Sequence, residues 1–292
     1  MARHVADLAV ALNVMAGPDP RDPATAANAG KTSTDYTAGL NPDTLKGARL
    51  GLLRDFMKQD PGVDAVVETA VAILRAKGAA VINIKLPNFV LGVNRGLYLA
   101  IRDPEFVSQI GDYLATLPRT DLPKTHDDII ALSEKITGPT KEGWVPNKNR
   151  LESYRREKKA GTTQDQPYRS ALEDGRKIVR ESLTWFIASE RLDAFIVPTS
   201  AKPPRLIKDD SVTLPPSING NSAILANVTG WPDLIVPAGF TSDPALPVGL
   251  SFIGPAFSEA RLLALGHAFE LAHPARALPV NTPALNGETI TY

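Results

Sequence analysis

Apolar residues gather in three short runs in the last third of the chain. The runs are Asp193–Pro198, Leu234–Phe240 and Leu246–Gly254, and each ends at or near a proline or glycine. Short runs of aromatic and β-branched residues bounded in this way favour buried strands over helices. A helix is predicted next, because Ser258 can cap it and apolar residues then recur at helical spacing up to Pro274.

The start of the chain has the pattern of an amphipathic helix. One face carries Val5, Leu8, Ala9, Leu12 and Ala16, and Gly17-Pro18 marks the end. The pattern begins almost at residue 1 and shows no N-cap of its own, as we expect for a chain cut inside a domain.

Two further strands are predicted on either side of a helix. Arg49–Leu53 and Val81–Leu86 have strand patterns, and Asp60-Pro61 places a cap before a proline at the first helical position. Lys77-Gly78 ends this helix. The strand–helix–strand order favours a right-handed parallel unit.

The middle of the chain is helical in pattern. Helices are expected around Pro104–Thr116, Asp127–Ile136 and Gly175–Arg191. Thr125 and Asp128 approximate a capping box for the second of these. Because no repeat and no low-complexity tract divides the chain, we expect an α/β fold that forms one domain over residues 1–292.

Composition narrows the classes of partner. Apolar residues make up 43% of the chain, and 32 basic residues balance 32 acidic ones, so no nucleic-acid or anionic-membrane partner is expected. No stretch approaches the roughly 18 consecutive apolar residues of a membrane span. The chain has no cysteine, which excludes disulfides and a cysteine nucleophile within it. Localisation is left open.

Known catalytic and metal-binding motifs are missing from the sequence. It has no G-x-S-x-G, H-E-x-x-H, Walker or G-x-G-x-x-G pattern. Its histidines, His4, His126, His267 and His273, are too scattered for a metal-ligand pattern and fit packed or surface positions.

Three polar or aromatic features have both a functional and a structural interpretation. Ser217–Ser222 fits an amide-binding loop, but Asn-Gly within it is first of all a turn dipeptide. Trp231 and Asn227 fit a substrate pocket, although a tryptophan before proline is as often a packing anchor. The basic run Arg155–Lys159 is better explained as a solvated helix face than as an RNA site.

Five segments, in a fixed order, resemble one protein family. They are Met1-Ala-Arg-His-Val-Ala-Asp7, Asp193-Ala-Phe-Ile-Val-Pro-Thr199, Gly230-Trp-Pro-Asp-Leu-Ile-Val-Pro-Ala-Gly239, Leu246-Pro-Val-Gly-Leu-Ser-Phe-Ile-Gly254 and Phe257-Ser-Glu-Ala-Arg-Leu-Leu263. In these segments the chain resembles the amidase signature hydrolases, and especially their peptide-amidase-like members.

The resemblance implies an α/β/α sandwich with a mixed central sheet, incomplete at its N-terminal side. In the family a lysine and two serines hydrolyse linear carboxamides, and all three lie upstream of the segments matched here. No residue of this chain is therefore expected to be catalytic, and no metal or cofactor is expected. Thr199, Asn227 and Trp231 are the substrate-binding candidates, for a small-molecule or peptide amide.

Three interpretations of the chain stay open. It is a catalytically incomplete amidase fragment, a non-enzymatic remnant that binds an amide or a partner, or a component of an amidotransferase-type assembly. The coding sequence upstream of Met1 and co-purifying partners distinguish them.

Overall fold

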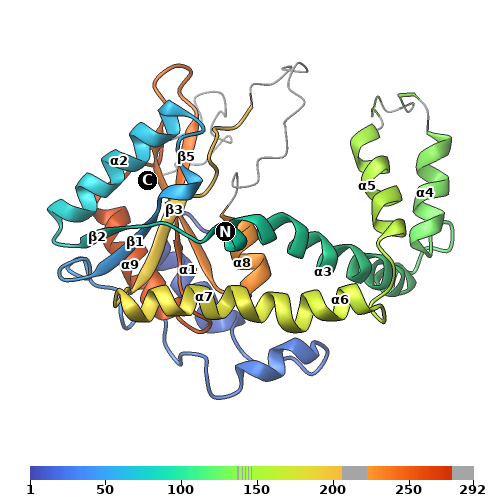
Figure 1. Cartoon of the computed structure of the whole chain (residues 1–292), viewed down its shortest axis with the longest axis horizontal. Helices are drawn as coiled ribbons and strands as arrows, with labels where there is room; N and C mark the ends of the chain where they lie inside the picture. Colours follow the sequence, from blue (N-terminus) through green and yellow to red (C-terminus); the bar gives the residue numbers. More distant parts are fainter. Residues whose placement is uncertain are drawn as a thin grey trace, which may run out of the picture. The chain divides into compact units, whose positions relative to one another are not determined.

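The computed structural model describes residues 1–136, 138–139, 141, 143, 145, 147–205 and 222–277, with the backbone alone at 92–95. Contacts divide the chain into two compact units. The first comprises Met1–Leu86, Phe186–Ala226 and Gly230–Tyr292, and the second comprises Pro87–Trp185 and Asn227–Thr229. Figure 1 shows the elements along the chain. The expected single domain concerns how these units associate, and it stays a prediction.

The first unit is built on a mixed sheet. Its strands are β1 (Arg49–Leu53), β2 (Ala80–Ile84), β3 (Ala194–Pro198), β4 (Asp233–Phe240) and β5 (Pro247–Ile253), in the order β2-β1-β3-β5-β4. β1 pairs in parallel with β2 and β3, whereas β5 pairs antiparallel with β3 and β4. The predicted strands and the parallel strand–helix–strand unit are therefore confirmed.

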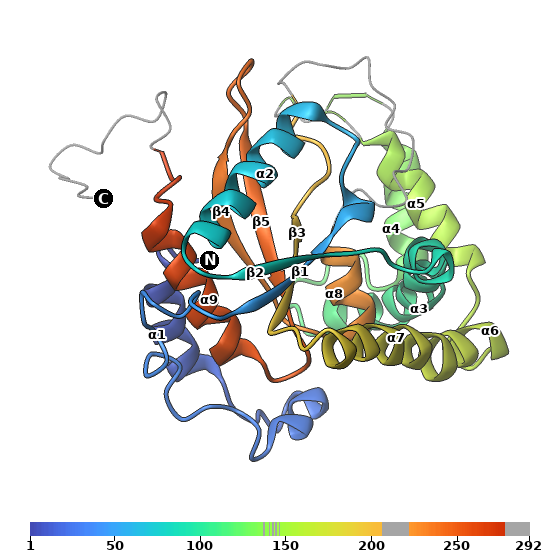
Figure 2. The same cartoon turned by 60° about the vertical axis from the view of Figure 1, so that its left-hand side comes forward.

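Three helices pack on one face of this sheet, where Figure 2 shows α2 and α9 across the strands. They are α1 (Val5–Met15), α2 (Pro61–Ala76) and α9 (Glu259–Ala272). Leu50, Ile196, Leu250 and Phe252 of the sheet are fully buried in this core. As predicted, Asp60 caps α2, its carboxylate accepting a hydrogen bond from the Val63 N–H at 2.9 Å.

Two predicted helix starts need correction. The first helix does not lack an N-terminal device, because the His4 N–H donates to the Asp7 carboxylate at 3.2 Å just before α1 begins. Ser258 occupies the N-cap position of α9, but its side chain makes no capping bond and its Oγ is buried without a partner among the described residues. Residue type alone does not show which way a side chain turns at a helix start.

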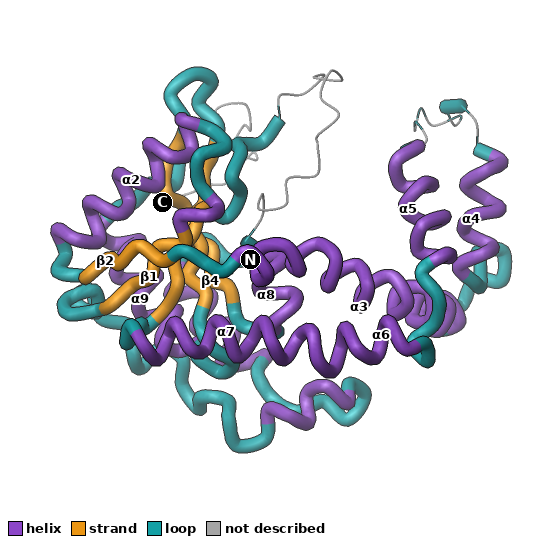
Figure 3. The backbone as a smooth tube through the Cα atoms, in the orientation of Figure 1, coloured by secondary structure: helices purple, strands orange, loops and turns teal. Residues whose placement is uncertain are grey.

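The second unit is helical (Figure 3). Its elements are α3 (Asn88–Ala115), α4 (His126–Lys135), α5 (Lys148–Lys159), α6 (Gln166–Ser170), a π-helical turn (Ala171–Gly175), and α7 (Arg176–Ser189) up to Trp185. α8 (Ala223–Thr229) spans the boundary between the units. Short 3₁₀ turns occur at Pro23–Asn28 and Arg54–Phe56 in the first unit.

The structure corrects the first of the helices predicted here and confirms the second. The helix expected to begin at Pro104 begins at Asn88 and continues through Pro104. A proline removes one backbone donor, and here the packing of α3 against α4 and α5 outweighs that loss. The capping box of α4 is present, since Thr125 accepts from the Asp128 N–H and Asp128 accepts from the Thr125 N–H. No helix in the described ranges is both long and apolar enough to span a membrane.

Candidate functional site

A chain of hydroxyl groups lies on the face of the sheet opposite α2, where β3 ends. The antiparallel register places Val197 of β3 beside Ser251 of β5. Thr199 follows directly, and its N–H donates to the Gly249 carbonyl at 2.9 Å. The Thr199 hydroxyl is then 2.9 Å from that of Ser251, which is 3.0 Å from the Ser222 hydroxyl.

The hydroxyl chain leads to a carboxyl group. The Ser222 hydroxyl donates to Asp233 Oδ2 at 3.4 Å, while Oδ1 is buried without a hydrogen-bond partner in the described part of the chain. Burial raises the pKa of Asp233 above its ordinary value, although hydrogen bonds from Ser251 and Ser222 act in the opposite direction. We call Thr199, Ser251, Ser222 and Asp233 the hydroxyl–carboxyl chain.

A groove of about 610 Å³ borders this chain. Its floor includes Asp233, Ile235, Pro237 and Gly239 of β4 together with Gly249 of β5, and its walls come from residues 1–5 and 275–277. Gly249 leaves room for the Thr199 hydroxyl, because a Cβ at this position would be 2.9 Å from Thr199 Oγ1. Thr199 is the partly exposed member of the chain, whereas Ser222 and Ser251 are fully buried.

The geometry suits binding rather than nucleophilic attack. A nucleophilic serine must reach its substrate, and Ser222 and Ser251 do not reach solvent. Within the described ranges, none of the three hydroxyls hydrogen-bonds to a lysine or a histidine. The same ranges contain no group of three or more histidine or acidic side chains placed to hold a metal ion.

The three predicted substrate-binding residues have different surroundings. Thr199 belongs to the hydroxyl–carboxyl chain. Trp231 is 7% exposed and stacks on Phe195 of β3, with ring centroids 6.5 Å apart, so it packs in the core of the first unit. Asn227 is exposed on α8, in the part grouped with the second unit. Of the predicted loop Ser217–Ser222, only Ser222 lies within the described residues. A substrate contact for any of these residues stays a prediction.

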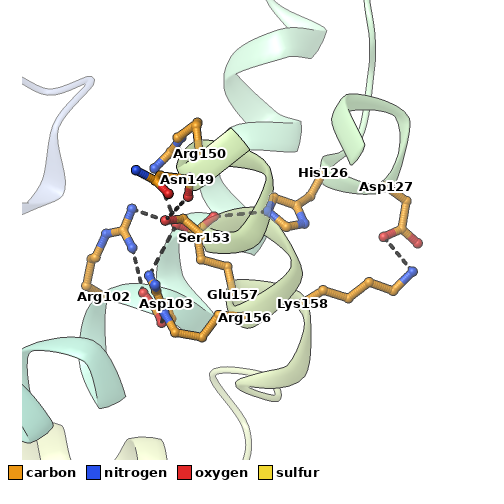
Figure 4. Close-up of polar contacts among 10 residues, drawn as sticks. All are labelled: Arg102, Asp103, His126, Asp127, Asn149, Arg150, Ser153, Arg156, Glu157 and Lys158. Carbon is orange, nitrogen blue, oxygen red and sulfur yellow. Dashed lines mark hydrogen bonds and ion pairs between the residues drawn. The ribbon is translucent and has the colours of Figure 1, made fainter. Parts of the chain in front are cut away.

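A second polar cluster, missed in the sequence, centres on Glu157 in the second unit (Figure 4). Glu157 lies on α5, within the run predicted as a solvated face, yet its side chain is 0% exposed. Oε1 is 2.7 Å from Arg102 of α3, and Oε2 is 3.2 Å from the buried His126 of α4. The prediction of a solvated face is therefore wrong at Glu157, since this carboxylate joins all three helices.

More charges complete the Glu157 cluster. Arg150 and Arg156 of α5 come within 3.6 and 3.9 Å of Glu157, and Arg156 also binds Asp103 at 2.9 Å. Burial alone would lower the pKa of Arg102, but its hydrogen bond to Asp103 and the charge of Glu157 raise that pKa above its ordinary value. This cluster is a buried ion-pair network that holds α3, α4 and α5 together.

Comparisons with known proteins agree with one another. The family model "Amidase" matches residues 1–263. A glutamyl-tRNA(Gln) amidotransferase subunit from Chloroflexus aggregans is 30% identical over 274 residues, which cover 92% of this chain and 53% of the relative.

Two solved structures show the same fold. The peptide amidase of Stenotrophomonas maltophilia has a TM-score of 0.77 and 32% identity, over 95% of this chain and 53% of that one. An amidase family protein of Bacillus anthracis has a TM-score of 0.72 and 26% identity, over 95% and 48%. The chain thus spans about half the length of the curated relatives it matches.

Proposed function

Because the chain belongs to the amidase family, we propose that it forms part of a hydrolase that cleaves the C–N bond of linear carboxamides. The observation that carries the proposal is the family match over residues 1–263. The resemblance assigns the lysine and both serines of the reaction to the half of such proteins that is not matched here. This chain then contributes the substrate-side wall, and acylation of the serine belongs to the other half.

The hydroxyl–carboxyl chain gives this wall a direction. An ionised Asp233 only accepts hydrogen bonds, so Ser222 donates to it, Ser251 donates to Ser222, and Thr199 donates to Ser251. The remaining lone pairs of the Thr199 oxygen are then free to accept the N–H of a carboxamide. In this scheme Thr199 contacts the substrate, while Ser251, Ser222 and Asp233 are positioning residues.

A peptide amide fits the groove better than free glutamine does. Ile235, Pro237 and Val248 give the groove apolar walls, which suit the side chains of a peptide more than a small charged amino acid. The likeness to a peptide amidase at 32% identity supports the same choice.

The test is a chimera that joins, ahead of Met1, the half of the S. maltophilia peptide amidase that this chain does not match. We expect it to release ammonia from a peptide amide, and we expect the isolated 292-residue chain to release none above the blank. In the chimera Thr199→Val should lower kcat/KM for the peptide amide about tenfold, a loss typical of one hydrogen bond, while Thr199→Ser retains activity. Turnover by the isolated chain would contradict the assignment of catalysis to the other half.

Membership of an amidotransferase is the second candidate, because the curated relatives include several amidotransferase subunits. It predicts that glutamine replaces the peptide amide as the preferred substrate of the chimera, and that further proteins co-purify with the chain. A chimera that folds and binds peptide amide without hydrolysing either substrate would favour the third interpretation, a non-enzymatic remnant.

A further inference from the structure

The outer edge of β4 is open. β4 pairs with β5 along one side, and no strand in the described ranges pairs with its other side. Ile235 and Phe240 of this strand have exposed fractions of 52% and 40%. The groove of about 610 Å³ runs along the same strand, between it and residues 1–5.

An open apolar edge of this kind is ordinarily covered. Unpaired strand edges offer backbone donors and acceptors to another chain, and proteins normally block or pair them. Here the edge is also the floor of a groove, so a segment that added to β4 would gain apolar contacts as well as backbone hydrogen bonds.

The size of the relatives indicates what covers this edge. The chain matches 53% of the S. maltophilia peptide amidase and 53% of the C. aggregans relative, so the family fold has a further half of comparable size. We propose that the β4 edge and its groove bind a polypeptide with the sequence of that complementary half, and that an extended segment of it pairs with Asp233–Val236. This inference rests on the proposed function, since such a partner would also bring the catalytic residues.

A second copy of this chain fits the edge less well. Pro237 has no N–H to donate, and the register between β4 and β5 shifts between Pro237 and Gly239. Pairing across a two-fold axis would be restricted to the four residues Asp233–Val236 on both chains. A partner of different sequence can continue past Pro237 by lying in the groove.

Co-expression tests the proposal. The tagged chain is produced together with the unmatched half of the S. maltophilia peptide amidase, and the complex is measured by native mass spectrometry and sedimentation. Ile235→Lys should weaken the complex about tenfold or more, because it places a charge where an apolar side chain is buried. Lysine is tolerated on open strand edges, so the variant should fold. Ile178→Lys is the matched control, since Ile178 of α7 is also 52% exposed but does not line the groove.

A one-to-one complex lost in Ile235→Lys and kept in Ile178→Lys supports the proposal. A dimer of the chain alone that Ile235→Lys abolishes would overturn it in favour of a second copy. If no complex forms, hydrogen exchange in the covalent chimera decides: amides of residues 233–236 should exchange more slowly than in the isolated chain, and equal exchange refutes the docking site. A complex that forms but hydrolyses no amide leaves the docking site intact and sinks only the proposed function.

Discussion

Replacing Glu157 by glutamine should destabilise the helical second unit. The substitution keeps the size of the side chain and removes its charge, which leaves Asp103 as the one buried carboxylate paired with Arg102 and Arg156 among the described residues. Glu157 is 0% exposed, so water does not replace the lost charge.

The magnitude follows from the exposure of the partners. Removing one member of a buried ion pair costs about 3–5 kcal/mol when the other charge stays uncompensated. Arg102, Arg150 and Arg156 have side chains that are 26%, 37% and 47% exposed, so they regain some hydration. We therefore expect the lower end, about 3 kcal/mol. For a protein of this size such a loss lowers the Tm by about 6–12 °C.

Urea unfolding followed by circular dichroism at 222 nm measures this loss, because the second unit is helical. Glu152→Gln is the matched control: Glu152 lies on the same helix and pairs with Arg155, but its side chain is 68% exposed, so its midpoint should stay at the wild-type value. A double-mutant cycle with Arg102→Gln isolates the ion pair. If Glu157→Gln costs less than about 1 kcal/mol, or the same in both backgrounds, the network does not hold the helices together.

Three further outcomes are expected. Gly249→Ala should displace the Thr199 hydroxyl, because the new Cβ would lie 2.9 Å from Thr199 Oγ1; we expect a loss of about 1–3 kcal/mol in urea unfolding, and unchanged stability would contradict the close packing. Asp233→Asn should leave stability unchanged near pH 3.8 and raise it at pH 7: the raised pKa means that neutral Asp233 stabilises the fold below its unfolded pKa, and that this contribution is lost as the pH rises through the folded pKa. A stability difference that does not vary with pH would refute this. Burial and the hydrogen bond to Glu105 raise the pKa of Tyr168 to about 12, so Tyr168→Phe should delete one phenol that titrates near that pH in the absorbance at 295 nm, and its stabilisation should be present below pH 10 and lost through about 12.

The strands could be predicted from the sequence because their signal is local. Each apolar run is bounded by proline or glycine, and β3, β4 and β5 lie within about one residue of the predicted runs. Elements whose limits depend on packing were less accessible. The continuation of α3 through Pro104 depends on contacts with α4 and α5, which a helix-breaking rule does not include.

The site was predictable only in part, for a related reason. Thr199 lies in a recognisable motif, but its partners Ser251 and Ser222 are 52 and 23 residues further along the chain. They meet because the antiparallel register sets Val197 beside Ser251, and a register is a property of two strands together. A single serine within an apolar strand, as in Ser251, is the signal that could have identified this chain of hydroxyls, since a buried hydroxyl requires a hydrogen-bond partner.

Glu157 shows the same limit on the helical side. α5 has almost no apolar pattern, so periodicity does not separate its buried face from its solvated one. The buried face became recognisable only when Arg102 and His126, from two other helices, were seen to converge on one carboxylate. A buried charge is stable only with its partners, so its position in a sequence is determined by residues that are distant along the chain. In both units the sequence therefore predicts where apolar surface is buried, whereas the buried polar groups, which limit where a substrate or a partner can bind, depend on the three-dimensional arrangement.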